Sequence, residues 1–196
     1  METKMIYSVG DPKKEISLQI KTLVIDEDKT NLIAGELESL LLRALKDELT
    51  EAEISEALGE DAADEIELCT EATIGTTQDG TVEIVYHENE NDAQIATLSK
   101  IIFRPESPNL LAMTKKGAIN TVLSFEEGRM HICAYDTPYM PFKVYVSAKT
   151  VDNRLLTEGK LKLDYVLNIN DTMPQHFVIT ALIKDAPSDI LKDFLK

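Results

Sequence analysis

The feature that most limits the fold of this chain is a two-residue alternation of apolar and polar side chains. Between residues 160 and 169, Leu161, Leu163, Tyr165, Leu167 and Ile169 alternate with Lys160, Lys162, Asp164 and Asn168. Successive side chains of a β-strand point to opposite faces, so this pattern predicts a strand with one buried face and one solvent-facing side.

Similar short segments, rich in β-branched residues, recur along most of the chain. Turn signals separate them, among them Asp79-Gly80, Lys116-Gly117 and Glu158-Gly159. Short strands and turns at this spacing are typical of an all-β sandwich or barrel whose neighbouring strands run antiparallel. We expect about ten strands, at 16–25, 66–76, 81–88, 94–104, 109–115, 118–125, 129–136, 141–150, 160–169 and 175–184.

A sheet of about ten strands in sequence order has two exposed edges unless it closes on itself. Closure also hides the apolar faces from water, so we predict a mainly β protein built as one antiparallel barrel. Barrels of eight or more strands can hold one small apolar ligand. The residues expected to line such a cavity are Val144, Val146, Leu163, Tyr165, Leu167 and Phe177.

One segment departs from the β pattern. Between residues 34 and 60 the apolar residues recur every three or four positions, which predicts an amphipathic helix over 36–48. Thr50 stands three residues before Glu53 in the capping-box arrangement, so a second helix should cover about 51–58, and Gly59 should end it in a left-handed conformation. We therefore expect a helical hairpin inserted after the first strand.

This insert is also where the charge of the chain concentrates. Residues 36–67 hold twelve acidic and two basic residues, which is ten of the fifteen excess negative charges. Its leucines Leu37, Leu41, Leu45 and Leu49 need an apolar partner, and the two partners considered are the open end of the barrel and another molecule. The insert is thus predicted to be a plug, a lid over a cavity, or a docking or dimerisation helix.

Composition excludes several classes of protein. The chain has 196 residues, 43% hydrophobic and 28% charged, which fits one soluble globular domain over 1–196. A net charge of −15 disfavours nucleic acid as a partner. No apolar run is long enough to cross a membrane, and the two distant cysteines, Cys69 and Cys133, fit a reducing compartment, so we expect a cytoplasmic protein. A short C-terminal helix is expected at 188–195.

Motifs of known chemistry are missing. His87, His131 and His176 show no metal-ligand spacing, and no CxxC, GxSxG, GxGxxG or P-loop occurs. His131, Cys133 and Tyr135 share one face of a strand, and polar residues on an alternating strand usually face water. The alternative is a polar group inside the barrel that binds an anionic head group. We expect no enzyme activity, no cofactor and no metal.

Several stretches resemble the YwiB-like family of uncharacterised bacterial proteins. The similarity covers residues 82–183 and includes VEIVYHE, LLAMTKKGAINTVLSFEEGR, the YDTP step at Tyr135 to Pro138, and EGKLKLDYVLNIN. The family has a domain of unknown function with a calycin-like, lipocalin-resembling barrel. Tyr139 and Met140 replace the glycine that usually follows the Thr-Pro step. The resemblance implies a barrel and transfers no catalytic residue.

The two leading hypotheses come from different classes of function. The first is non-enzymatic binding of a small apolar or amphipathic ligand in the barrel interior. The second is an interaction module in which the acidic helical insert docks on a protein partner.

Overall fold

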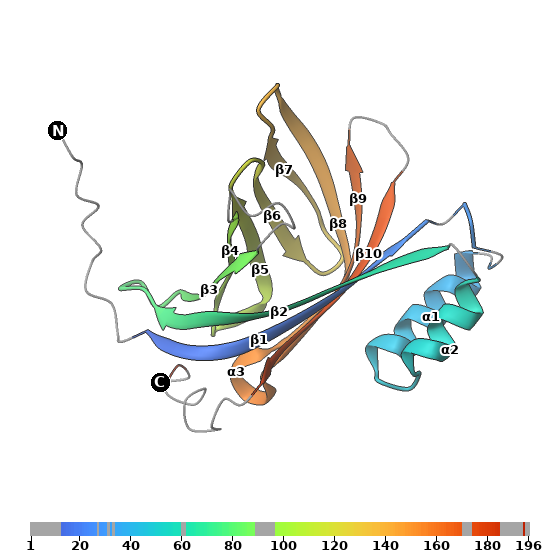
Figure 1. Cartoon of the computed structure of the whole chain (residues 1–196), viewed down its shortest axis with the longest axis horizontal. Coiled ribbons are helices and arrows are strands. Elements are labelled where there is room, and N and C mark those ends of the chain that lie inside the picture. Colours follow the sequence, from blue (N-terminus) through green and yellow to red (C-terminus); the bar gives the residue numbers. More distant parts are fainter. Residues whose placement is uncertain are drawn as a thin grey trace.

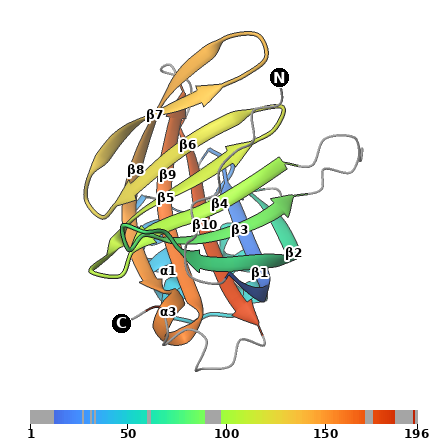
Figure 2. The same ribbon diagram turned by 90° about the vertical axis from the view of Figure 1, so that its left-hand side faces the viewer.

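A computed structural model describes residues 13–26, 28–30, 32, 34–59, 62–88, 97–169, 174–184 and 194. It contains ten strands and three helices over these residues (Figures 1 and 2). The strands are β1 (Lys14–Ile25), β2 (Ala63–Thr76), β3 (Val82–Glu88), β4 (Thr97–Arg104), β5 (Ser107–Lys116), β6 (Asn120–Glu126), β7 (Met130–Asp136), β8 (Pro141–Arg154), β9 (Lys160–Ile169) and β10 (Gln175–Lys184). The helices are α1 (Ala34–Leu45), α2 (Glu51–Leu58) and α3 (Leu155–Glu158).

The ten strands form a closed antiparallel barrel, as predicted. Each strand pairs with its neighbours in sequence, and β1 pairs with both β2 and β10 to close the ring. Facing residues such as Leu18 on β1 and Ile183 on β10 lie directly opposite each other in the closing pair. Closure gives every strand two hydrogen-bonded neighbours, so no edge is left to pair with other chains.

The main core fills the interior of the barrel with side chains from the inward face of all ten strands. The aromatic rings of Phe125 and Tyr165 meet edge to face at 4.9 Å, and those of Tyr165 and Phe177 stack at 5.1 Å. The one-turn helix α3, which the sequence analysis did not predict, buries Leu155 and Leu156 in the same core. It lies at the end of the barrel opposite the β7–β8 hairpin (Figure 2).

The helical insert follows β1, as predicted, and its second helix begins with the predicted capping box. The Glu53 amide donates to Thr50 Oγ1 at 3.3 Å, and the Thr50 amide donates to Glu53 Oε2 at 2.7 Å. Gly59 ends α2 with φ of 96° and ψ of 158°, which has a positive φ but is not the left-handed helical conformation that we expected. The predicted C-terminal helix at 188–195 lies outside the described residues except for Phe194.

The insert packs on the outer wall of the barrel, which is a burial site that we did not consider. Leu37, Leu41 and Leu45 are buried, and Leu37 and Leu41 form a second core with Ile25 of β1, against which Leu49 and Val178 of β10 also pack. In Figure 1, strands β1 and β2 lie between the helices α1 and α2 on one side and strands β3 to β7 on the other. The insert is therefore neither a plug nor a lid at the open end.

Candidate functional site

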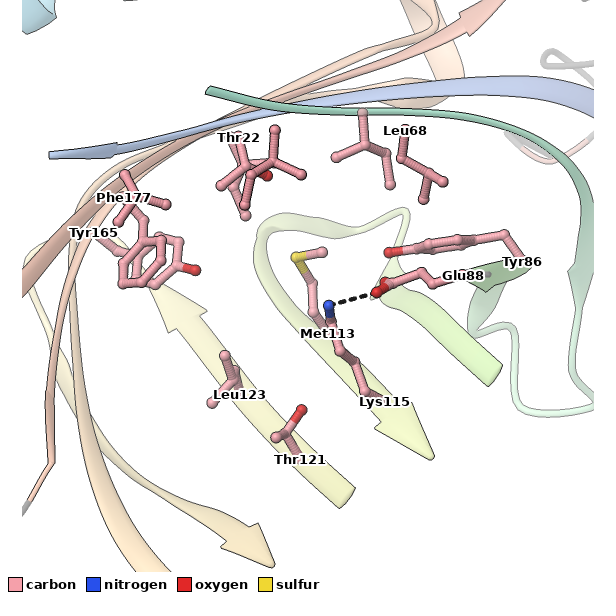
Figure 3. A pocket seen from close by; sticks show the side chains of 14 residues that line it. Thr22, Leu68, Tyr86, Glu88, Met113, Lys115, Thr121, Leu123, Tyr165 and Phe177 are labelled. Atoms are coloured by element: carbon pink, nitrogen blue, oxygen red, sulfur yellow. Dashed lines mark hydrogen bonds and ion pairs between the residues drawn. The ribbon is translucent and has the colours of Figure 1, made fainter. Parts of the chain in front are cut away.

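A partly open cavity of about 230 Å³ lies inside the barrel, on the side away from α3. Side chains from seven strands surround it (Figure 3). Its lining residues are Ile20, Thr22, Val24, Ile66, Leu68, Tyr86, Glu88, Met113, Lys115, Thr121, Leu123, Tyr165, Phe177 and Ile179. Most of them are apolar, which is the usual composition of a small-molecule pocket.

The wall formed by β1, β2, β9 and β10 is almost entirely apolar. Ile20, Val24 and Leu68 lie on one part of it, and the stacked rings of Tyr165 and Phe177 on the other. Burial raises the pKa of the Tyr165 phenol, so its hydroxyl stays protonated and can act as a hydrogen-bond donor at neutral pH. Figure 3 shows this hydroxyl directed into the cavity.

The opposite wall carries a row of polar side chains on neighbouring strands. The strand registers place these side chains in one line: Tyr86 of β3 is opposite Ser99 of β4, Ser99 is opposite Lys115 of β5, and Lys115 is opposite Thr121 of β6. Because residues opposite each other in a ladder share a face, all four point inward. The row continues to Tyr135 on β7.

An ion pair lies at this polar row. Glu88 accepts a hydrogen bond from Lys115 Nζ at 2.7 Å (Figure 3). It accepts another from Ser99 Oγ at 2.8 Å. Burial and then the charge of Glu88 raise the pKa of Tyr86. Glu88 thus accepts from two protein donors, one on each carboxylate oxygen.

Two of the six residues that we predicted to line a cavity do so. Tyr165 and Phe177 line it, whereas Val144, Val146, Leu163 and Leu167 are buried in the core without contacting it. The prediction missed Lys115 and Thr121, although a signal was present. Lys115 continues the alternation of Leu111 and Met113 on the inward face of β5.

The structure corrects the predicted orientation of β7. Cys133 faces Val144 and His131 faces Val146, both on the inward side of β8, so these two residues point into the barrel. The apolar residues Met130 and Ile132 take the outer face, where each is 63% exposed. His131 lies 3.6 Å from Glu126 and does not line the cavity.

Another correction concerns the outer face of β9. We expected Lys162 and Asp164 to face water, yet both are buried, and Lys162 is buried against the insert. Lys162 Nζ donates to the Leu45 carbonyl at the end of α1 and to Asp47 Oδ1 at 2.8 Å. Asp164 lies 2.5 Å from His176, which is also buried.

These contacts hold the insert in place. Lys160 also contacts Asp47, which has a φ of 59° just after α1. Burial alone would raise the pKa of Asp47, but its hydrogen bonds with the two lysines outweigh this effect and lower it. Of the four leucines that we proposed as a lid or partner surface, Leu37, Leu41 and Leu49 pack in the second core on the outer wall of the barrel. Leu45 is also buried, and none of the four lines the cavity.

Neither a metal cluster nor a disulfide is present in the part of the chain that the structure describes. No three His, Cys, Asp or Glu side chains in that part are arranged to hold a metal ion. Cys69 is exposed and Cys133 is buried, and both are free thiols. None of the helices over the described residues is long and apolar enough to span a membrane.

Comparison with known proteins identifies the family. Residues 51–180, more than half of the chain, match the family described as Domain of unknown function (DUF1934). The chain belongs to this family. The search of curated proteins found no match to the sequence of this chain.

The fold has a solved relative. The structure is similar to the crystal structure of the YwiB protein from Bacillus subtilis, with a TM-score of 0.54 and 15% sequence identity. The alignment covers 87% of this chain and 92% of that chain. The resemblance that the sequence suggested is confirmed at the level of family and barrel fold.

Proposed function

We propose that this DUF1934 protein binds a small amphipathic molecule inside its barrel, without catalysis, in the cytoplasm. The observation that carries the proposal is the cavity of about 230 Å³, with an apolar wall on one side and a polar row on the other. A ligand with one apolar and one polar part matches this division.

The size of the cavity restricts the ligand. Sites for drug-sized molecules begin at about 300 Å³, whereas an apolar cavity of about 150 Å³ accommodates benzene. A volume of about 230 Å³ therefore suits a single substituted ring or a short chain. The stacked pair of Tyr165 and Phe177 offers an aromatic surface for such a ring.

The test uses the methyl group of Met113, which lines the cavity, as a reporter. We expect single-ring probes such as benzamide and benzoate to shift the Met113 resonance in ¹H–¹³C spectra of protein labelled at its methionine methyl groups. The resonances of Met130 and Met140, which are exposed, should not move.

A matched pair of variants tests where the probe binds. Leu123→Phe adds a ring inside the cavity and should abolish the Met113 response. Val122→Phe adds the same ring at the neighbouring position on the outer face, where Val122 is 49% exposed, and should leave the response unchanged. If no single-ring probe shifts Met113, or if both variants respond alike, the proposed function is wrong.

A further inference from the structure

We infer that the ligand is a small organic anion, such as a monocarboxylate, whose charged group binds to Lys115 and Thr121 while its apolar part lies against the β1 and β10 wall. This inference rests on the proposed function and specifies the chemistry of its ligand. It follows from a count of hydrogen-bond donors and acceptors on the polar row.

The charged acceptor of the row already has protein partners. Glu88 accepts from Ser99 Oγ on Oε1 at 2.8 Å and from Lys115 Nζ on Oε2 at 2.7 Å. Each carboxylate oxygen therefore carries one protein donor, and a ligand donor would have to share an oxygen with Ser99 or Lys115.

The donors of the row are in excess. A lysine ammonium carries three N–H donors, and in the described part of the chain the one acceptor of Lys115 is Glu88. No hydrogen bond between described residues engages the hydroxyl of Thr121, which is the direct neighbour of Lys115 across the β5–β6 ladder. The same holds for the hydroxyl of Tyr165, on the far side of the cavity. The site thus presents donors that a ligand acceptor can satisfy.

The position of Lys115 favours a ligand whose anionic group lies at the open end of the cavity. Lys115 is near the end of β5 and its side chain is 47% exposed, whereas Met113, two residues deeper on the same face, is buried. A carboxylate at Lys115 keeps part of its hydration while the apolar part enters the cavity. The acidic insert packs on the outer wall of the barrel, and no residue of α1 or α2 lines the cavity.

The experiment compares three probes of almost the same shape and different charge. They are benzoate, benzamide and benzamidinium, and Met113 again reports their binding. Charge-assisted hydrogen bonds are about twice as strong as neutral ones, so we expect benzoate to bind at least about tenfold more tightly than benzamide. Benzamidinium should bind most weakly, because Lys115 repels it and each Glu88 oxygen already accepts from a protein donor.

Three variants assign the preference to Lys115. Lys115→Met should remove the difference between benzoate and benzamide. Lys116→Met makes the same change at the next residue, which points outward and is exposed, and should preserve the difference. Glu88→Gln keeps the size of the side chain and removes its negative charge, so it should raise the affinity for benzoate. It also tests the inference if Lys115→Met does not fold.

The outcomes separate the two proposals. If no probe shifts Met113, the proposed function fails and this inference fails with it. If benzamide binds as tightly as benzoate, the cavity is a binding site but the anionic ligand is wrong. If benzamidinium binds most tightly, or if Lys116→Met abolishes the benzoate preference as Lys115→Met does, the assignment to Lys115 is overturned.

Discussion

Replacing Leu41 by alanine tests whether the helical insert is a structural part of the outer wall or a cover of the cavity. Leu41 is 1% exposed and packs in the second core, between α1 and the outer faces of β1 and β10. The neighbouring Leu42 is 45% exposed and supplies the matched control.

The expected cost follows from burial. Leu→Ala removes about three carbon atoms, which lose about 2.4 kcal/mol of transfer free energy at about 0.8 kcal/mol per methylene group. A cavity term is added, but a helix on the surface can move closer to the sheet and fill part of the space. We therefore expect Leu41→Ala to lower the free energy of unfolding by about 3 kcal/mol, and Leu42→Ala by less than about 1 kcal/mol.

Urea denaturation followed by circular dichroism measures both values, and the Met113 shift measures binding in the same variants. The affinity for benzoate should change by less than about twofold in either variant, because no helix residue lines the cavity. A loss of tenfold or more in Leu41→Ala, with the protein still folded, would show that the insert controls the cavity. Equal destabilisation by the two substitutions would contradict the burial on which the estimate is based.

Three further predictions concern turns and glycines. Hydrogen bonds from Thr77 and Thr81 and the Arg104 guanidinium lower the pKa of Asp79 to about 2, below its ordinary value of 3.8. The ionised form stabilises the fold above pH 3.8, so the stability lost in Asp79→Asn should be constant at neutral pH and disappear as the pH falls towards 2. Thermal unfolding between pH 7 and pH 2 checks this, and a difference that persists at pH 2 would contradict it. Gly35→Ala should stabilise the protein by about 0.5 kcal/mol in urea denaturation, because an added Cβ meets nothing within 4 Å in α1. Gly117→Ala should destabilise it by about 1–3 kcal/mol in the same assay, because the Cβ would lie 2.6 Å from the Thr97 hydroxyl.

The elements of the fold could be predicted because their signals are local. Alternation along 160–169 predicted β9 with its buried face, and Leu161, Leu163 and Tyr165 are all buried. The capping box at Thr50 predicted the start of α2 to the residue. These patterns involve contacts within one strand or one helical turn, so the sequence displays them directly.

The orientation of β7 could not be predicted, because it depends on pairing. The strand has apolar residues on one face and His131 and Cys133 on the other, and alternation alone does not say which face is inside. The register decides: Cys133 is opposite Val144, whose side chain is completely buried. The polar face of β7 is thereby turned inward and Met130 and Ile132 are exposed.

The burial of Lys162 also escaped prediction, because it depends on a segment more than a hundred residues away. From its own strand, Lys162 belongs to a solvated face. The leucines of the insert pack on the outer face of β1 and β10. In this position the end of α1 also covers Lys162 of β9. The cavity was missed in part for a similar reason, since its volume is set by side chains on seven strands.

The insert and the cavity lie on opposite faces of the same strands, and this arrangement protects the composition of the cavity wall. On β9, Tyr165 faces the cavity, whereas on the outer face Lys162 contacts Asp47 of the insert and Asp164 contacts His176. A slip of one residue in the pairing would reverse every side chain of the strand. Lys162 and Asp164 would then enter the apolar interior without Asp47 and His176, and an unpaired buried charge is strongly unfavourable. These contacts on the outer face therefore favour the register that gives the cavity its apolar wall.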